Sequence, residues 1–165
     1  MCIRDSHWDH LGGIRAAIAE GATIVTHESN KAFIERVAMT EHTIRPDRQS
    51  EVKKAAVVQT IGDDGQLTDG KRVIELHRLQ GYEHTGDMLV VYLPADRILG
   101  EPDAFTPPAQ AGAPLIAPAV PAAKALADNI KRLKLNVRTI APFHGNRLTD
   151  VAEVEKAAGT AVATR

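Results

Sequence analysis

The sequence predicts an α/β sandwich, in which helices pack against β-sheet. Three observations support this fold class. Helix-like and strand-like patterns alternate in the first third of the chain, several strand-like segments follow one another in the middle, and hydrophobic residues make up 44% of the 165 residues. Because aromatic residues contribute only 4%, we expect a core built mainly from Val, Ile, Leu and Ala.

The first third of the chain alternates between the two patterns. The expected elements are a helix over 11–20, a strand over 22–26, a helix over 29–39, an exposed polar excursion over 40–55 and a strand over 57–61. Gly21 is a stop signal for the first helix, and Ser29 is placed to cap the second. Both strands are short runs rich in β-branched residues, which favour extended backbone.

The rest of the chain groups its strands before its last helices. The expected elements are a turn at 63–65, strands over 72–79, 88–93 and 97–100, a loop over 106–121, a helix over 122–133, a strand over 137–141 and a helix over 150–158 that Thr149 caps. Residues 88–93 are almost all apolar, which predicts burial on both faces. Five prolines exclude regular structure from 106–121. This loop either borders a pocket or is a spacer, and we expect the spacer.

A short cluster near the N-terminus carries the clearest chemical signal. His7, Asp9 and His10 offer three metal-ligating side chains within four residues. Imidazole and carboxylate groups suit zinc, and also iron or manganese. A tight loop ending at a helix N-terminus could converge these side chains, and Gly12-Gly13 fits such a turn because glycine tolerates unusual backbone angles and close approach.

Three further candidate ligands each follow a predicted strand: His84, Asp103 and His144. Each alone would be an ordinary loop residue, but a metal needs distant ligands to complete the set that begins at residues 7–10. Glu101 could compete with Asp103 for the same role. The histidines that we expect to be structural or exposed are His27, His42 and His77.

The segment His7-Trp8-Asp9-His10-Leu11-Gly12-Gly13 resembles the signature loop of the metallo-β-lactamase fold superfamily. The later pieces follow in the order of that family: Glu83-His84, then Met88 to Leu93, then Asp103, then Ala141-Pro142-Phe143-His144-Gly145. The resemblance covers nearly the whole chain from His7 onward. It implies a partial αββα sandwich of the metallo-β-lactamase type that lacks most of the first sheet, with residues 7–165 forming the C-terminal part of a single domain.

The resemblance also implies a role for each candidate ligand. His7 and His84 would bind a first metal ion, Asp9, His10 and His144 a second, and Asp103 would bridge both. Two zinc ions are expected, with iron or manganese as alternatives. A hydroxide held between the metals would attack an ester, lactone, thioester or amide. Asp9 would also be catalytic, because it could orient the hydroxide and handle a proton.

The N-terminus departs from the family pattern. The family motif begins with a His two residues before His7, where this chain has Asp5. Residues 1–6 show neither strand nor helix period, so we expect a non-native cloning or assembly scar, with a short natural tail as the alternative. A damaged first metal site follows, and the second hypothesis for function is therefore a truncated, non-catalytic metal-binding remnant of such a domain.

Charge and composition limit the partners. Twenty basic and 21 acidic residues give a net charge of -1, which provides no basic field for nucleic acid or a membrane surface. We expect a small-molecule substrate, no nucleic acid, no membrane, and self-association through an exposed sheet edge. The single cysteine, Cys2, excludes an internal disulfide. The compartment stays open, although the resemblance is to a bacterial branch whose members are often exported.

Overall fold

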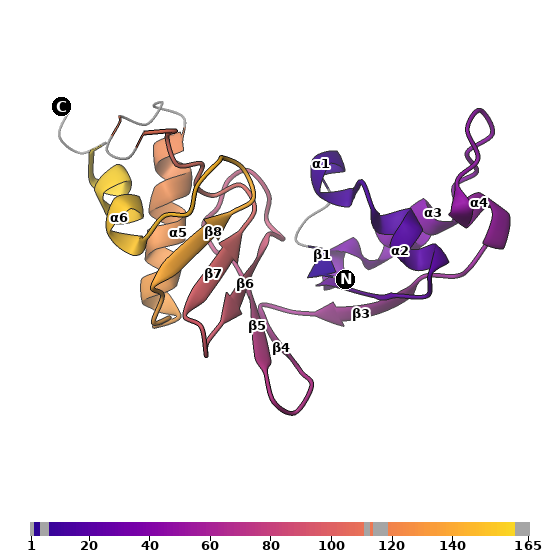
Figure 1. Cartoon of the computed structure of the whole chain (residues 1–165), viewed down its shortest axis with the longest axis horizontal. Helices are drawn as coiled ribbons and strands as arrows, with labels where there is room; N and C mark the ends of the chain where they lie inside the picture. The colour runs from indigo at the N-terminus through magenta and orange to yellow at the C-terminus, as the bar shows by residue number, and fades with distance from the viewer. Residues whose placement is uncertain (1, 4–6, 111–112, 114–118, 161–165) are drawn as a thin grey trace. The chain divides into compact units, whose positions relative to one another are not determined.

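The computed structural model describes residues 2–3, 7–110, 113 and 119–160. The chain divides into two compact units, Met1–Asp63 and Asp64–Arg165, whose helices and strands are labelled in Figure 1. Within the described residues, no helix has the length and apolar character needed to cross a bilayer.

The first unit contains a three-stranded parallel sheet in the order β1-β2-β3. Its strands are β1 (Cys2–Ile3), β2 (Thr23–His27) and β3 (Val57–Ile61), and its helices are α1 (Trp8–Leu11), α2 (Ile14–Ala19), α3 (Lys31–Met39) and α4 (Arg48–Val52), with a 3-10 turn, η1 (Glu28–Asn30). Ile14 and Ile18 of α2, Ile24 of β2 and Ile34 of α3 are buried together. The alternation of helix and strand predicted for this region is confirmed.

The second unit contains a five-stranded sheet in the order β4-β5-β6-β7-β8. Its elements are β4 (Asp64–Thr68), β5 (Val73–Arg78), β6 (Leu89–Leu93), β7 (Ile98–Glu101), α5 (Val120–Arg132), β8 (Thr139–Pro142) and α6 (Val151–Thr160). Neighbouring strands are antiparallel except β7 and β8, which are parallel. A parallel pair needs a crossover connection, and α5 lies within it.

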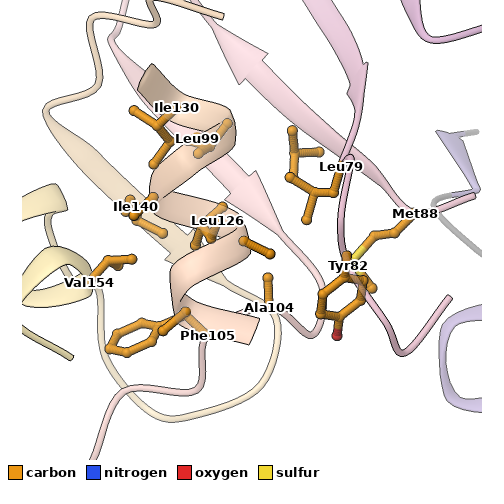
Figure 2. Packing of buried hydrophobic residues seen from close by; sticks show 14 of the residues in the cluster. Leu79, Tyr82, Met88, Leu99, Ala104, Phe105, Leu126, Ile130, Ile140 and Val154 are labelled. Carbon is orange, nitrogen blue, oxygen red and sulfur yellow. The ribbon is translucent and has the colours of Figure 1, made fainter. Parts of the chain in front are cut away.

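Figure 2 shows the core of the second unit, where α5 lies against the sheet. Leu126 of α5 packs with Leu99 of β7 and Ile140 of β8, and all three are 0% exposed. Ala104 and Phe105, in the loop after β7, belong to the same core. The buried side chains of Ala104 and Phe105 therefore anchor the loop that follows β7. This anchoring restricts the position of Asp103, which immediately precedes Ala104.

The expected turn at 63–65 is wrong, because Asp64–Thr68 forms β4 and pairs with β5. The hairpin turns at Asp69 and Gly70 instead, where Asp69 Oδ1 accepts hydrogen bonds from the backbone nitrogens of Lys71 and Arg72. Among the described strands, β4 pairs only with β5. It is largely polar, so it lacks the apolar alternation from which strands are predicted.

Three local expectations also need correction. The polar excursion contains a helix, α4, whose N-cap Asp47 accepts a hydrogen bond from the backbone nitrogen of Ser50. The second predicted helix starts at Lys31, because Ser29 lies in η1. At the last helix, the carboxylate of Asp150, and not Thr149, accepts from the backbone nitrogen of Glu153.

The N-terminal segment and the proline-containing loop are only partly described. Cys2 and Ile3 form β1, which pairs in parallel with Val25 and Thr26 of β2, although the sequence there shows no strand period. The remaining residues of 1–6, including Asp5, lie outside the described residues, as do 111–112 and 114–118 of the loop. The expectations for a non-native segment and for one single domain stay predictions.

Candidate metal centre

Three predicted ligands meet in the second unit. Nε2 of His144 lies 2.8 Å from Oδ1 of Asp103, and Nε2 of His84 lies 3.7 Å from Oδ2 of the same carboxylate. The Asp103 side chain is only 15% exposed, whereas both imidazoles are about half exposed. One shielded carboxylate thus lies between two accessible imidazoles, and imidazole and carboxylate groups are side chains that bind zinc.

The strand order explains why these distant residues meet. β5 and β7 are each antiparallel to β6, so they run in the same direction, and β8 runs parallel to β7. Their carboxyl ends therefore lie at one edge of the sheet. His84 follows β5, Asp103 follows β7 and His144 follows β8. The sheet topology brings together the three residues that the sequence predicted as ligands.

Asp103 lies in a loop, and hydrogen bonds with neighbouring side chains fix the backbone of that loop. Oε2 of Glu101, a fully buried residue, accepts hydrogen bonds from the backbone nitrogens of Ala104 at 2.7 Å and Phe105 at 3.1 Å. The Tyr82 hydroxyl donates to the backbone carbonyl of Asp103 at 3.0 Å. Glu101 therefore fixes the loop that carries Asp103, and does not compete with Asp103 as the sequence had allowed.

Tyr82 also contacts one of the histidines. Its ring meets the His84 ring edge to face, with centroids 5.9 Å apart, and Figure 2 shows Tyr82 at one edge of the buried core. Sequence reasoning missed both Tyr82 and Glu101. Tyr82 lies two residues before His84, and Glu101 two residues before Asp103, but the direction of a side chain is not encoded in such spacing.

The loop after β8 is tied to the loop after β7. Gly145 has a φ of +110°, and a Cβ there would lie 3.3 Å from Cδ of Pro107, so glycine is required next to His144. Nε of Arg147 donates to the Pro108 carbonyl at 2.8 Å. The guanidinium also pairs with Glu153, which raises the pKa of Arg147. The start of the proline-containing loop therefore contacts the segment that follows His144.

The other three predicted ligands lie together in the first unit. His7 immediately precedes α1, and its carbonyl accepts a hydrogen bond from the backbone nitrogen of His10 at 3.1 Å. The His7 and His10 ring centroids are 6.4 Å apart, and Nε2 of His10 lies 3.7 Å from Oδ2 of Asp9. The expected helix N-terminus is present at His7, but Asp9 and His10 lie within the short helix α1 and not in a loop before it.

The explanation offered for Gly12-Gly13 is wrong. Both glycines have negative φ values, -52° and -102°, and a Cβ at either position would meet nothing within 4 Å. Neither unusual backbone angles nor close approach requires glycine at these two positions.

The remaining histidines contact protein groups in the way that structural residues do. Nδ1 of His27 lies 2.8 Å from the Ser29 hydroxyl. The two ring nitrogens of His77 lie 2.6 Å from Asp64 and 3.1 Å from Glu75. The His42 ring is 43% exposed, with Nδ1 3.7 Å from Asp47.

A cavity of about 650 Å³ adjoins the cluster within the second unit. We call it the Glu83 cavity. Its described lining residues are Gly81, Tyr82, Glu83, His84, Asp103, Ala104, Thr106, Ala119, Pro121 and Ala122. Because the cavity shares His84 and Asp103 with the cluster, a molecule bound in it would reach both side chains.

Comparisons with known proteins identify the fold. No known family model matches the chain, and no curated protein matches it. Among solved structures, a metallo-β-lactamase from Pontibacter korlensis aligns with a TM-score of 0.60 and 20% identity, covering 99% of this chain and 68% of that one. An archaeal metallo-β-lactamase superfamily protein from Sulfolobus tokodaii aligns with a TM-score of 0.63 and 16% identity, covering 99% and 68%.

The fold is shared by proteins of different activities. Rubredoxin oxygen:oxidoreductase from Desulfovibrio gigas aligns with a TM-score of 0.63 and 17% identity, covering 98% of this chain and 42% of that one. The chain therefore has a partial metallo-β-lactamase fold, as the sequence predicted, and it spans about two thirds of the length of the first two structures. The fold alone does not assign the reaction.

Proposed function

We propose that this protein is a metal-dependent hydrolase that cleaves an ester, lactone, thioester or amide. The observation that carries the proposal is the cluster of His84, Asp103 and His144, in which one shielded carboxylate lies between two accessible imidazoles at a single sheet edge. Nitrogen and carboxylate donors in this arrangement suit zinc.

The proposed ligand set follows from the order of the candidate residues along the sequence. We assign His7 and His84 to one zinc ion, Asp9, His10 and His144 to a second, and Asp103 to both. The order of these residues along the chain, which resembles that of the metallo-β-lactamase superfamily, supports the assignment. Iron or manganese would suit the same donors.

The residues of the chain would have different roles in the proposed hydrolysis. Zinc supplies Lewis acidity, which lowers the pKa of water and polarises a carbonyl group. The Asp9 side chain is 33% exposed, so its carboxylate could orient the attacking water and accept a proton at an oxygen. Glu101 and Tyr82 hold Asp103 in place through the loop backbone. This scheme requires no serine or cysteine nucleophile.

Metal retention tests the proposal directly. Protein loaded with zinc and dialysed should retain metal by elemental analysis, and the variants His144→Ala and Asp103→Asn should retain less. His42→Gln is the matched control, because His42 is exposed and belongs to the first unit's surface. Loss of all metal from the unaltered protein, or equal retention by every variant, would exclude the metal centre. Hydrolysis of a panel of esters, lactones, thioesters and amides then tests catalysis.

A non-catalytic metal-binding protein is the second candidate. Asp5 favours it, because the family motif that the chain resembles has a His at that place. This candidate predicts at most one retained metal ion per chain and no turnover of any substrate in the panel. Two retained ions with turnover would exclude it.

A further inference from the structure

We infer that Asn129 is a positioning residue for His84, because its buried side chain fixes the backbone of Gln80, where the chain turns from β5 toward His84. The inference rests on the proposed function, since His84 has a chemical role there as a zinc ligand. Its basis is one side chain of α5 that forms hydrogen bonds with both backbone polar groups of a single residue.

Asn129 is the polar residue on the buried face of α5. Its exposed fraction is 3%, and the other buried residues of the helix are alanine, leucine or isoleucine. A polar group in such surroundings costs free energy unless it is hydrogen-bonded, so an amide at this position needs specific partners. The partners of Asn129 therefore indicate what the residue does.

All polar atoms of the Asn129 side chain have partners. Oδ1 accepts a hydrogen bond from the Gln80 backbone nitrogen at 3.0 Å, and Nδ2 donates to the Gln80 carbonyl at 2.8 Å. Nδ2 also donates to the Ala125 carbonyl at 2.8 Å, and Oδ1 accepts from Nη2 of Arg132 at 2.9 Å. A guanidinium group only donates, so Arg132 fixes the orientation of the amide and hence both hydrogen bonds to Gln80.

Gln80 lies just beyond the paired part of β5. The backbone nitrogen of Leu79 still donates to the Met88 carbonyl at 2.9 Å, but Gln80 follows the last residue of β5 that pairs with β6. Backbone polar groups beside a core need partners, and Asn129 supplies both for Gln80, as a neighbouring strand would. Gly81 then has a φ of +71°, which glycine adopts readily. The direction in which the chain leaves the sheet is therefore set at Gln80 and Gly81.

The segment from Gln80 to His84 contains a second anchor. Tyr82 is buried in the same core as Leu79 (Figure 2), and its hydroxyl donates to the Asp103 carbonyl at 3.0 Å. His84 itself is about half exposed, so the position of its imidazole beside Asp103 depends on the segment that precedes it. The same segment lines the Glu83 cavity. Loss of the hydrogen bonds at Gln80 should therefore displace the His84 imidazole relative to Asp103.

Nuclear magnetic resonance of the zinc-free protein tests the inference without metal or activity. In the unaltered protein, the Gln80 amide should exchange slowly with solvent, because it donates to a buried acceptor. Asn129→Ala removes that acceptor, so the Gln80 amide should exchange about tenfold faster or more, and the ring signals of His84 should shift. Asn129→Leu keeps the branched shape of the side chain without its hydrogen bonds, and it gives the same test if the alanine variant does not fold.

Two controls separate positioning from a general loss of stability. Ile130→Ala removes a buried side chain from the same helix and weakens its packing, but it keeps the amide of Asn129. Asn136→Ala removes an asparagine before β8 whose Oδ1 accepts a hydrogen bond from Arg97 at 2.6 Å. All proteins are compared below the onset of thermal unfolding. In both controls, the ring signals of His84 should match those of the unaltered protein.

Zinc affinity then connects Asn129 to the proposed metal centre. In competition with a chelator, both Asn129 variants should bind zinc about tenfold more weakly than the unaltered protein, as is typical when residues that orient metal ligands are lost. The two controls should bind zinc as tightly as the unaltered protein. Cobalt in place of zinc should give visible absorption bands that shift in the Asn129 variants alone, since these bands depend on the arrangement of the ligands.

The outcomes distinguish a failure of this inference from a failure of the proposed function. A Gln80 amide that exchanges freely in the unaltered protein would overturn the inference. Unchanged His84 ring signals or unchanged zinc affinity in both Asn129 variants would do the same, as would an equal change in Ile130→Ala. If the unaltered protein binds no zinc, the proposed function fails, and the His84 ring signals of the zinc-free variants still decide whether Asn129 positions this side chain.

Discussion

Oε2 of Glu101 lies 2.7 Å from the backbone nitrogen of Ala104, and this hydrogen bond joins the end of β7 to the loop that carries Asp103. The carboxylate accepts a second hydrogen bond from Phe105 and is fully buried. A buried acceptor of two backbone N–H groups restricts the backbone between them. Glu101 is therefore a positioning residue for the candidate metal centre.

Two substitutions of Glu101 should show how this residue contributes to the stability of the fold and to zinc affinity. Glu101→Ala removes both hydrogen bonds and leaves two buried N–H groups without an acceptor, so unfolding should become easier by about 3 kcal/mol. Glu101→Gln keeps an oxygen acceptor and should lose much less stability. Chemical denaturation measures this difference. Zinc affinity by competition with a chelator should fall in the alanine variant and largely persist in the glutamine variant. Unchanged zinc affinity in Glu101→Ala would contradict the positioning role.

The ion pair of Arg15 and Asp47 should control acid stability in the first unit. Nε and Nη2 of Arg15 donate to the two Asp47 oxygens at 2.6 and 2.8 Å, and Nη1 donates to the carbonyls of Val37 and Thr40. The hydrogen bond from Arg15 holds the pKa of Asp47 well below its ordinary value of 3.8. Because this pKa is lower in the folded than in the unfolded protein, the ion pair stabilises the fold at pH values above the unfolded pKa. This stabilisation is lost as the pH falls below about 4.

Denaturation at several pH values tests this linkage. The unaltered protein should lose stability progressively from about pH 4 downward, and Asp47→Asn should show a flatter dependence there with lower stability at neutral pH. Arg15→Lys retains the positive charge but loses the bidentate geometry of the guanidinium. The pH dependence of its stability should therefore lie between those of the unaltered protein and Asp47→Asn. Parallel pH profiles for the unaltered protein and Asp47→Asn would be inconsistent with this assignment.

The sequence predicted the candidate ligands better than it predicted the elements between them. His84, Asp103 and His144 were identified because each follows a strand with a clear apolar pattern, and the common direction of β5, β7 and β8 brings them together. β4 was missed because its residues, Asp64–Thr68, are largely polar and, within the part of the chain that the structure describes, pair with β5 alone. Its formation depends on pairing with β5, which a local pattern does not contain.

Other features depend on tertiary contacts that a local pattern cannot reveal. α4 lies in a polar segment, but Arg15, distant in sequence, contacts its cap residue Asp47 and the Ser50 hydroxyl. Glu101 was considered as a ligand because a carboxylate beside Asp103 has suitable chemistry. Its orientation toward the amides of Ala104 and Phe105 gives it a different role.

Gly145 should be intolerant of any side chain. Its φ of +110° is strained for an L-residue, and a Cβ would lie 3.3 Å from Pro107. Gly145→Ala should therefore destabilise the protein by about 1–3 kcal/mol and lower zinc retention, since His144 is adjacent. Gly86→Ala is the control, because a Cβ there would meet nothing within 4 Å and its φ is not positive. Equal melting temperatures and equal metal content in the two variants would oppose this view.

The exposed edge of the first unit's sheet should promote self-association. Among the described residues, β3 pairs only with β2, and Val57 at the start of β3 is 60% exposed. An edge strand with unpaired backbone groups and an exposed aliphatic side chain is a template for pairing with another chain. Sedimentation velocity of the unaltered protein should therefore show species larger than a monomer, in proportions that rise with concentration.

Matched lysine substitutions test whether the edge itself is responsible. Val57→Lys should shift the distribution toward monomer, because a charge on an edge strand opposes edge-to-edge pairing. Ile44→Lys removes an aliphatic side chain that is 95% exposed and adds the same charge, but it lies outside every strand. It should leave most of the association in place. If both variants become equally monomeric, general apolar exposure rather than the β3 edge causes the association, and a monomeric unaltered protein would exclude association through the edge altogether.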